Sequence, residues 1–65
     1  MPIAQIVMME GRDVEKKRRL IAAGTDAIEK SLDAPRATIR VILVEVPKEH
    51  FGIGGVSAAE LAGAP

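Results

Sequence analysis

The run Ile39 to Val46 (IRVILVEV) constrains the fold of this chain more than any other segment. It is rich in β-branched residues and almost continuously hydrophobic, which is typical of a β-strand that is covered on both faces. A chain of 65 residues can bury only about 60% of the surface that its unfolded form exposes. We therefore expect a single domain, residues 1–65, that needs partner subunits to complete its core.

The other devices that stabilise a small domain are disulfides and structural metals, and the composition disfavours both. The chain has no cysteine and one histidine, His50, so disulfides are impossible and good metal ligands are scarce. Hydrophobic residues make up 48% of the sequence, which is more than so small a monomer can hide. We therefore expect a multimer that is not held together by disulfides or a structural metal.

The charges and the hydropathy exclude several classes of partner. Nine basic residues balance nine acidic ones, so the chain offers no basic surface for nucleic acid. No apolar run approaches the roughly 20 residues of a membrane span, and the N-terminal segment lacks the pattern of a secretory signal. We expect no nucleic-acid or membrane partner and a cytoplasmic location.

The first half of the chain predicts a strand followed by a helix. Residues Ile3 to Met8 form a short apolar run, and Val14 to Leu32 repeat apolar residues at helical spacing. Asp13 suits the N-cap of this helix, and Pro35 stops the helix soon after Leu32. Gly24, inside the helix, indicates the close approach of a strand that lies across it.

The second half adds a strand and a short terminal unit. The strand Ile39 to Val46 ends at Pro47, and the segment FGIGG at 51–55 predicts a turn or hairpin. The Ala-rich residues 57–65 predict either a short terminal element or a frayed end. The order strand, helix, strand predicts a βαβ unit with parallel strands and a right-handed crossover.

Pro2 is the residue with the most unusual chemical potential. Removal of Met1 would turn its nitrogen into a secondary amine, and an α-amino group has a pKa of about 8. Such a group can take up and return a proton near neutral pH, and burial or nearby cations would lower its pKa further. The alternative is that Pro2 simply starts a strand. By themselves, the residues favour that alternative.

Three further side chains are candidates for a binding site. Arg12, in the turn after the first strand, and Arg40, at the start of the second, carry guanidinium groups that can bind carboxylates bidentately. For any single arginine, a solvated surface charge or an ion pair is the more common role. Phe51 is the sole aromatic residue, and such a residue is more often part of a core than a substrate wall.

Five segments together resemble a known family: PIAQI at 2–6, EGR at 10–12, SLDAP at 31–35, IRVILVEV at 39–46 and HFGIGG at 50–55. In order and spacing they are similar to the 4-oxalocrotonate tautomerase family of the tautomerase superfamily. The resemblance implies an α+β fold, a β-α-β subunit with a short C-terminal hairpin. It also implies that strands pair across subunits into a four-stranded sheet, within a homohexamer that is a trimer of dimers.

The resemblance implies an isomerase that uses no cofactor or metal in aromatic hydrocarbon catabolism. It would convert 2-hydroxymuconate-type dienols, dicarboxylates of the 2-hydroxydienoate class, into conjugated 2-oxo acids, with Pro2 as general base and acid. Arg12 would bind the distal carboxylate, and Arg40 of a neighbouring subunit would hold the 2-oxygen and the first carboxylate. Phe51 would wall the pocket and keep the pKa of the amine low, and the backbone at Met9 would contact substrate.

Two positions depart from the family pattern, and two other functions stay open. Val7 stands where well-known members carry histidine, and Arg36 replaces an aliphatic residue, which adds a cation near the expected pocket mouth. A 3-haloacrylate dehalogenase or hydratase of the same superfamily would need a carboxylate beside the proline, and Glu49 is close in sequence but out of register. The chain could also be a non-catalytic assembly subunit.

Overall fold

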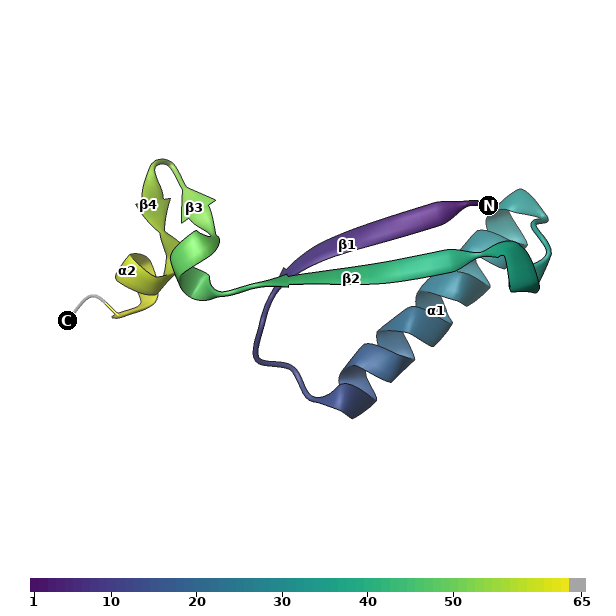
Figure 1. Ribbon diagram of the computed structural model, residues 1–65, viewed down its shortest axis with the longest axis horizontal. Coiled ribbons are helices and arrows are strands. Elements are labelled where there is room, and N and C mark those ends of the chain that lie inside the picture. The colour runs from purple at the N-terminus through teal and green to yellow at the C-terminus, as the bar shows by residue number, and fades with distance from the viewer. Residues whose placement is uncertain (64–65) are drawn as a thin grey trace.

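The computed structural model describes residues 1–63, and Figure 1 shows a β-α-β unit joined to a small C-terminal unit by the end of one strand. The elements are β1 (Ile3–Met9), α1 (Val14–Leu32), the 3₁₀ turn η1 (Arg36–Thr38), β2 (Arg40–Val46), the 3₁₀ turn η2 (Lys48–His50), β3 (Gly52–Ile53), β4 (Val56–Ser57) and α2 (Ala58–Gly63). The predicted β-α-β subunit with a C-terminal hairpin is confirmed.

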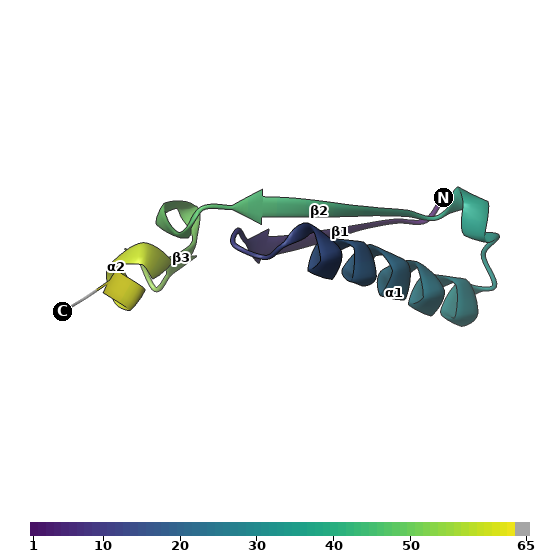
Figure 2. The ribbon, with the colours of Figure 1, turned by 90° about the horizontal axis from the view of Figure 1, so that it is seen from below.

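The strands β1 and β2 pair in parallel, from Ile3 opposite Arg40 to Met9 opposite Val46. Side chains alternate between the two faces of a strand, so one face of this pair lies against α1, as Figure 2 shows. A salt bridge of 2.8 Å between Lys17 Nζ and Glu45 Oε1 joins the helix to the covered face. Within residues 1–63, no element covers the opposite face.

Helix α1 has the bounds that the sequence predicts. The Asp13 carboxylate accepts a hydrogen bond of 2.9 Å from the backbone N–H of Lys16, and this satisfies one of the unpaired amides of the first turn. The helix ends because Asp33 turns the backbone into the left-handed region, with φ 53°. Aspartate tolerates this conformation better than most residues do.

Gly24 lies where α1 crosses β2. A Cβ built on this glycine would lie 3.6 Å from Val41 Cγ2, which is an ordinary van der Waals distance. The strand does lie across the helix, as predicted, but the contact is with the Val41 side chain. There is therefore room for a methyl group at position 24.

The C-terminal unit is an antiparallel hairpin followed by a short helix. Gly54 and Gly55 form the turn with φ 59° and 90°, values that glycine adopts without strain. Ser57 caps α2, because its hydroxyl oxygen accepts a bond of 3.2 Å from the backbone N–H of Glu60. The predicted terminal element is α2, except that residues 64 and 65 lie outside the described part.

The described chain hides little of its hydrophobic surface. Its buried hydrophobic residues are Ile39 and Ala58, whereas Val7 and Ile42 on the open face of the sheet are 63% and 44% exposed. A compact protein of 6.9 kDa exposes about 4,000 Å², but this chain exposes 4850 Å². Its radius of gyration is 15.2 Å, against about 11 Å for a compact domain of this length.

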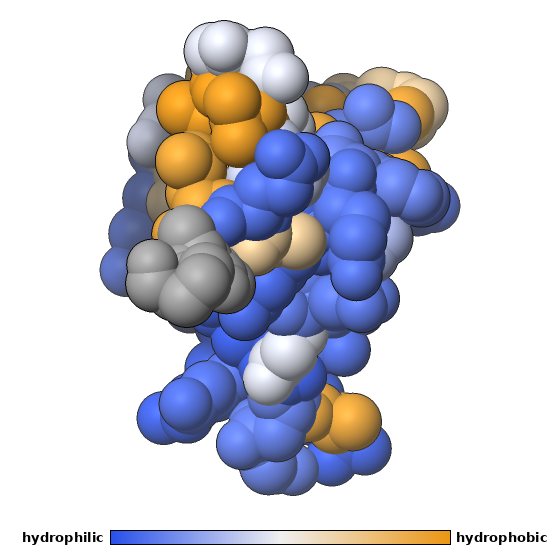
Figure 3. Space-filling model, turned by 90° about the vertical axis from the view of Figure 1, so that its left-hand side faces the viewer, coloured by the Kyte–Doolittle hydropathy of each residue, from blue (hydrophilic) through white to orange (hydrophobic). Residues whose placement is uncertain are grey.

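Hydrophobic side chains are also exposed at the C-terminal end of the molecule. Ile53, Val56 and Leu61 lie on β3, β4 and α2 and are exposed. Figure 3 looks onto that end and shows hydrophobic atoms gathered beside a hydrophilic surface. Both this end and the open face of the sheet are surfaces that a single chain leaves uncovered.

Candidate active site

Pro2 and Arg40 lie at the same end of the paired strands. Pro2 immediately precedes β1 and is half-buried. Its carbonyl oxygen accepts a hydrogen bond of 3.0 Å from the backbone N–H of Arg40. The parallel register therefore places the start of the chain beside the residue that opens β2.

The Arg40 guanidinium is held against the preceding turn. Its Nη1 donates to the carbonyl oxygens of Ala37, at 2.9 Å, and Ile39, at 3.3 Å. Since a guanidinium has five N–H donors and these bonds use one nitrogen, the remaining donors can still bind an anion. These contacts restrict the position of the guanidinium, and they leave its charge in place because both acceptors are uncharged carbonyl groups.

The N-terminal amine lies next to the same turn. The ammonium group of Met1 donates a hydrogen bond of 2.8 Å to the carbonyl oxygen of Thr38. While Met1 is present, the Pro2 nitrogen belongs to a peptide bond and has no basic lone pair. Any acid-base role for Pro2 therefore requires that Met1 be removed.

Arg12, Met9 and Phe51 lie toward the other end of the strands. Met9 is the last residue of β1 and is half-buried, and Arg12 follows in the loop before α1. Among residues 1–63, no hydrogen bond or salt bridge engages the Arg12 guanidinium. Phe51 follows η2, is half-buried, and accepts a hydrogen bond of 2.7 Å on its carbonyl oxygen from the backbone N–H of Ala58.

The predicted site residues thus fall into two groups at opposite ends of β1, the strand whose course Figures 1 and 2 show. β1 contains seven residues, and at about 3.3 Å per residue the strand separates its ends by roughly 20 Å. A six-carbon dicarboxylate is much shorter than this. One chain brings Pro2 close to Arg40 but does not bring either of them close to Arg12 or Phe51.

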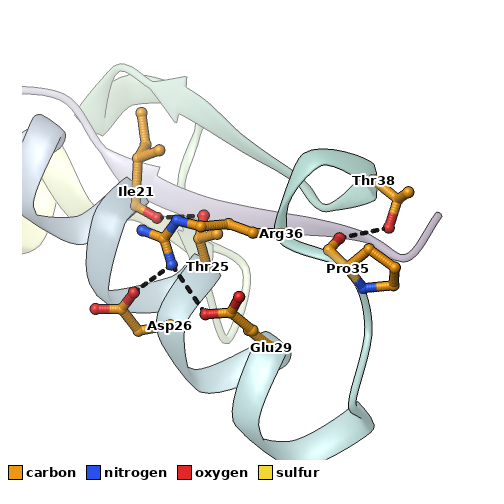
Figure 4. Close-up of polar contacts among 7 residues, drawn as sticks. All are labelled: Ile21, Thr25, Asp26, Glu29, Pro35, Arg36 and Thr38. Carbon is orange, nitrogen blue, oxygen red and sulfur yellow. Dashed lines mark hydrogen bonds and ion pairs between the residues drawn. The ribbon is translucent and has the colours of Figure 1, made fainter.

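Arg36 is engaged by acidic residues of α1, as Figure 4 shows. Its Nη1 lies 2.5 Å from an Asp26 carboxylate oxygen and 3.2 Å from one of Glu29. The hydrogen bond to Asp26 and the charge of that carboxylate raise the pKa of Arg36, and Glu29 adds to the effect. The extra cation that the sequence places near the pocket mouth is therefore paired within its own chain.

An open cleft of about 450 Å³ lies near the Arg12 end, lined by Glu10, Gly11, Lys48, Glu49, Ala59 and Ala62. It contains neither Pro2 nor Arg40, so it is not a complete version of the predicted site. The described residues contain no group of three potential ligands that could hold a metal ion. None of the helices in residues 1–63 combines the length and the apolar character that crossing a membrane requires.

Sequence reasoning missed the turn η1. The carbonyl oxygens of Ala37 and Thr38 accept hydrogen bonds from Arg40 and from the terminal ammonium. Every residue has a backbone carbonyl group, so the residue types in the sequence do not indicate which of these oxygens accept the bonds. The spacing of Pro35 and Thr38 is the one available indication, because a hydroxyl three residues after a proline can close such a turn, as it does here.

Comparison with known proteins agrees with the observed fold. Residues 2–61 match the family of tautomerase enzymes, so the match starts at Pro2. A 2-hydroxymuconate tautomerase from Stutzerimonas stutzeri is 59% identical over 58 residues, which cover 89% of this chain and 92% of that protein.

Solved structures of related proteins have the same fold over nearly the whole chain. A 4-oxalocrotonate tautomerase isozyme from Methylibium petroleiphilum has a TM-score of 0.94 at 39% identity, covering 98% of this chain and 100% of that one. A heterohexamer 4-oxalocrotonate tautomerase from Chloroflexus aurantiacus has a TM-score of 0.88 at 43% identity, covering 94% and 98%. Sequence and fold agree over nearly the whole length, and the chain therefore belongs to the tautomerase family.

Proposed function

We propose that this chain is a cofactor-independent 2-hydroxymuconate tautomerase in which the Pro2 nitrogen, freed by removal of Met1, is the general base and acid. The observation that carries this proposal is the position of Pro2 immediately before β1, where its carbonyl oxygen accepts a hydrogen bond of 3.0 Å from the backbone N–H of Arg40. An amine at this position has a guanidinium-bearing residue on the adjacent strand. The substrate class follows from the name of the relative that is 59% identical.

The proposed reaction moves one proton and two double bonds. Neutral Pro2 takes the proton from the 2-hydroxyl group, and the electron pair of the O–H bond forms the C2=O bond. The C2=C3 bond becomes C3=C4, and the electrons of C4=C5 take a proton at C5 from the Pro2 ammonium. The product is 2-oxo-3-hexenedioate, and the amine returns to its starting state.

The two arginines suit a dicarboxylate that gains charge during this reaction. Arg40 would hold the 2-oxygen and the first carboxylate, where a preorganised cation stabilises the developing dienolate. Arg12 would bind the distal carboxylate and draw electron density toward C5. Arginine serves here because its guanidinium stays protonated and does not compete as an acid.

The remaining proposed contacts shape the pocket. Phe51 would exclude water, and the low dielectric around it would keep the pKa of Pro2 low and strengthen the pairing with the arginines. The backbone at Met9 would contact the substrate. These residues lie at the opposite end of β1 from Pro2 in one chain, so the proposed pocket draws on several chains.

We infer that the assembly is a homohexamer, a trimer of dimers, of single-domain subunits. Three observations support association: the open face of the sheet, the exposed C-terminal end and the separation of the two groups of site residues. A solved relative is described as a heterohexamer. In the proposed assembly, β1 and β2 pair with the same strands of a second subunit in a four-stranded sheet. The cytoplasmic location and a role in aromatic catabolism stay predictions.

Ultraviolet-monitored ketonisation of 2-hydroxymuconate tests this function. The protein must have an N-terminus verified as Pro2, and the comparison is Pro2→Ala with the same verified processing. We expect kcat to fall by about 10² to 10⁴, the usual contribution of a general acid-base group. A second control is protein that retains Met1, which we expect to resemble Pro2→Ala. Equal rates with and without the proline would refute the mechanism, and halide release from a 3-haloacrylate would favour the dehalogenase alternative.

A further inference from the structure

The ladder between β1 and β2 determines what lies opposite the Pro2 nitrogen. At the far end of the pair, the N–H of Glu10 donates to the carbonyl oxygen of Val46 at 3.0 Å, 36 positions later in the chain. Hydrogen bonds repeat every two residues along a parallel pair. The same offset at the near end pairs the nitrogen of Pro2 with the carbonyl oxygen of Thr38.

While Met1 is present, this ladder position cannot be filled, because a proline within a chain has no N–H. The Thr38 oxygen instead accepts the bond of 2.8 Å from the Met1 ammonium. Removal of Met1 transfers the terminal positive charge to Pro2 and gives its nitrogen two N–H groups when protonated. The strand register then directs one of them at the Thr38 oxygen.

The turn that carries this oxygen is held at several points. The backbone N–H of Thr38 and its hydroxyl both donate to the carbonyl oxygen of Pro35, at 2.9 and 2.7 Å. The Ile39 N–H donates to the carbonyl oxygen of Arg36 at 3.1 Å. The Arg36 side chain in turn reaches the carboxylates of Asp26 and Glu29 on α1, as Figure 4 shows.

We propose that Thr38 is a positioning residue of the active site, whose backbone carbonyl accepts a hydrogen bond from the Pro2 amine, and that the ion pairs of Arg36 anchor the turn that presents it. This inference rests on the proposed function, because Pro2 must be the working amine. With one N–H held by Thr38, the other points away from the ladder and is the proton that is exchanged with substrate. The bond orients the lone pair of the neutral amine in the same direction.

The bond also changes the charge balance at the amine. A carbonyl that accepts from an ammonium stabilises the protonated form and raises the pKa of the amine. It therefore opposes cations and burial, which lower that pKa. The charged groups on the elements beside the N-terminus are Arg36 and Arg40, with Asp26, Glu29 and Lys30 in the C-terminal half of α1 and Asp33 just after it.

A backbone substitution tests the bond directly. Chemical synthesis of residues 2–65 allows ¹⁵N-labelled Pro2 and an ester in place of the amide that joins Thr38 to Ile39. The ester makes the Thr38 carbonyl a weaker acceptor and deletes the Ile39 N–H. The matched control is an ester between Ala37 and Thr38, which deletes the Thr38 N–H and weakens the Ala37 carbonyl that accepts from Arg40, but leaves the Thr38 carbonyl an amide.

The pKa of Pro2, read from a ¹⁵N NMR titration, is the deciding measurement. We expect the first ester to lower it by about 0.5 to 1 pH unit, since charge-assisted bonds are strong, and the control ester to leave it unchanged. The acid limb of the kcat/KM profile should move with it. Equal values of the pKa in both esters would overturn the role of Thr38.

Side-chain variants test the anchor. Arg36→Met removes a cation and leaves Asp26 and Glu29 unpaired, which by itself would raise the pKa of Pro2. A fall in this pKa, partly restored in Arg36→Lys, would therefore report loss of the anchor, with sedimentation verifying that the assembly persists. An unchanged or raised pKa in Arg36→Met would overturn the role of Arg36. Absence of turnover in the unsubstituted synthetic chain would count against the proposed function instead, because the NMR titration can be read without turnover.

Discussion

Mixing two inactive variants should restore activity, because no single chain brings all the proposed site residues together. Pro2 and Arg12 lie at opposite ends of β1, roughly 20 Å apart at about 3.3 Å per residue. If both serve one site, they come from different chains. A chain with Pro2→Ala still provides Arg12, and a chain with Arg12→Ala still provides Pro2.

The size of the effect follows from counting. In a random assembly with a fraction x of Pro2→Ala chains, a site has an intact proline with probability 1 − x and an intact arginine with probability x. Activity should follow x(1 − x) and reach about one quarter of the wild-type value in an equal mixture. Each variant alone should have low activity. In Pro2→Ala we expect kcat to fall by a factor of about 10² to 10⁴. In Arg12→Ala the loss of a charged contact should lower kcat/KM by about tenfold to a hundredfold.

The assay is co-refolding of the two variants from denaturant at a series of ratios, followed by ketonisation of 2-hydroxymuconate. Variants refolded separately, mixed without denaturant and assayed at once, at a concentration that keeps the assembly complete, are the control. A parabola with its maximum at equal amounts supports the argument. If co-refolded mixtures show only the sum of the two weak activities, Pro2 and Arg12 act within one chain and the reasoning from the strand length is wrong.

Three further predictions concern folding and assembly. Val7→Asp places a charge on the open face of the sheet, where the side chain is 63% exposed in one chain, and should dissociate the assembly in sedimentation, whereas Ala23→Asp on the exposed side of α1 should not. Gly24→Ala should raise the free energy of unfolding by about 1 kcal/mol per subunit, because helix propensity improves and Val41 leaves room for the methyl; Ala23→Gly should lower it by a similar amount, and a lower melting temperature for Gly24→Ala at equal concentration would contradict the packing argument. Asp13→Ala removes the cap of α1 and should cost about 1 kcal/mol in a denaturant titration, with Asp13→Asn largely retaining the stability.

The long elements could be predicted from sequence because their signals are local and periodic. The bounds of α1 agree at both ends, β1 extends one residue beyond the prediction to Met9, and β2 begins one residue later, at Arg40. The helix stop has a different cause from the one predicted. Pro35 restricts the residue before it, but the turn itself is made by Asp33 in the left-handed conformation.

The short elements were harder to predict for physical reasons. Each 3₁₀ turn follows a proline and is closed by two backbone hydrogen bonds, the first from Thr38 to Pro35 in one turn and from His50 to Pro47 in the other. Three residues are too few to show a hydrophobic period. Helix α2 did have a signal, because Ser57 and Glu60 have the spacing of a capping box. The Ser57 hydroxyl accepts from the Glu60 N–H as in that motif, although the Glu60 carboxylate accepts from the Ser57 hydroxyl and not from its backbone N–H.

The candidate site, like the fold, could be predicted from the sequence only in part. Residue types made Pro2, Arg12 and Arg40 candidates but did not single them out, because a proline often starts a strand and the chain has five arginines. The resemblance of five segments to a known family did so. Their arrangement could not be predicted in this way. It depends on which ends of β1 and β2 lie together, and on carbonyl groups that every residue has.

Because one chain has almost no hydrophobic core, dilution of the protein should favour unfolding. The described chain buries only Ile39 and Ala58 among its hydrophobic residues, so most of the free energy of folding must come from contacts between subunits. In a hexamer, each tenfold dilution then lowers the stability per subunit by about 1.1 kcal/mol. A catalytic rate per subunit that decreases at nanomolar protein concentrations would report the unfolding of separated subunits. The turnover number must therefore be measured at concentrations at which the assembly is complete.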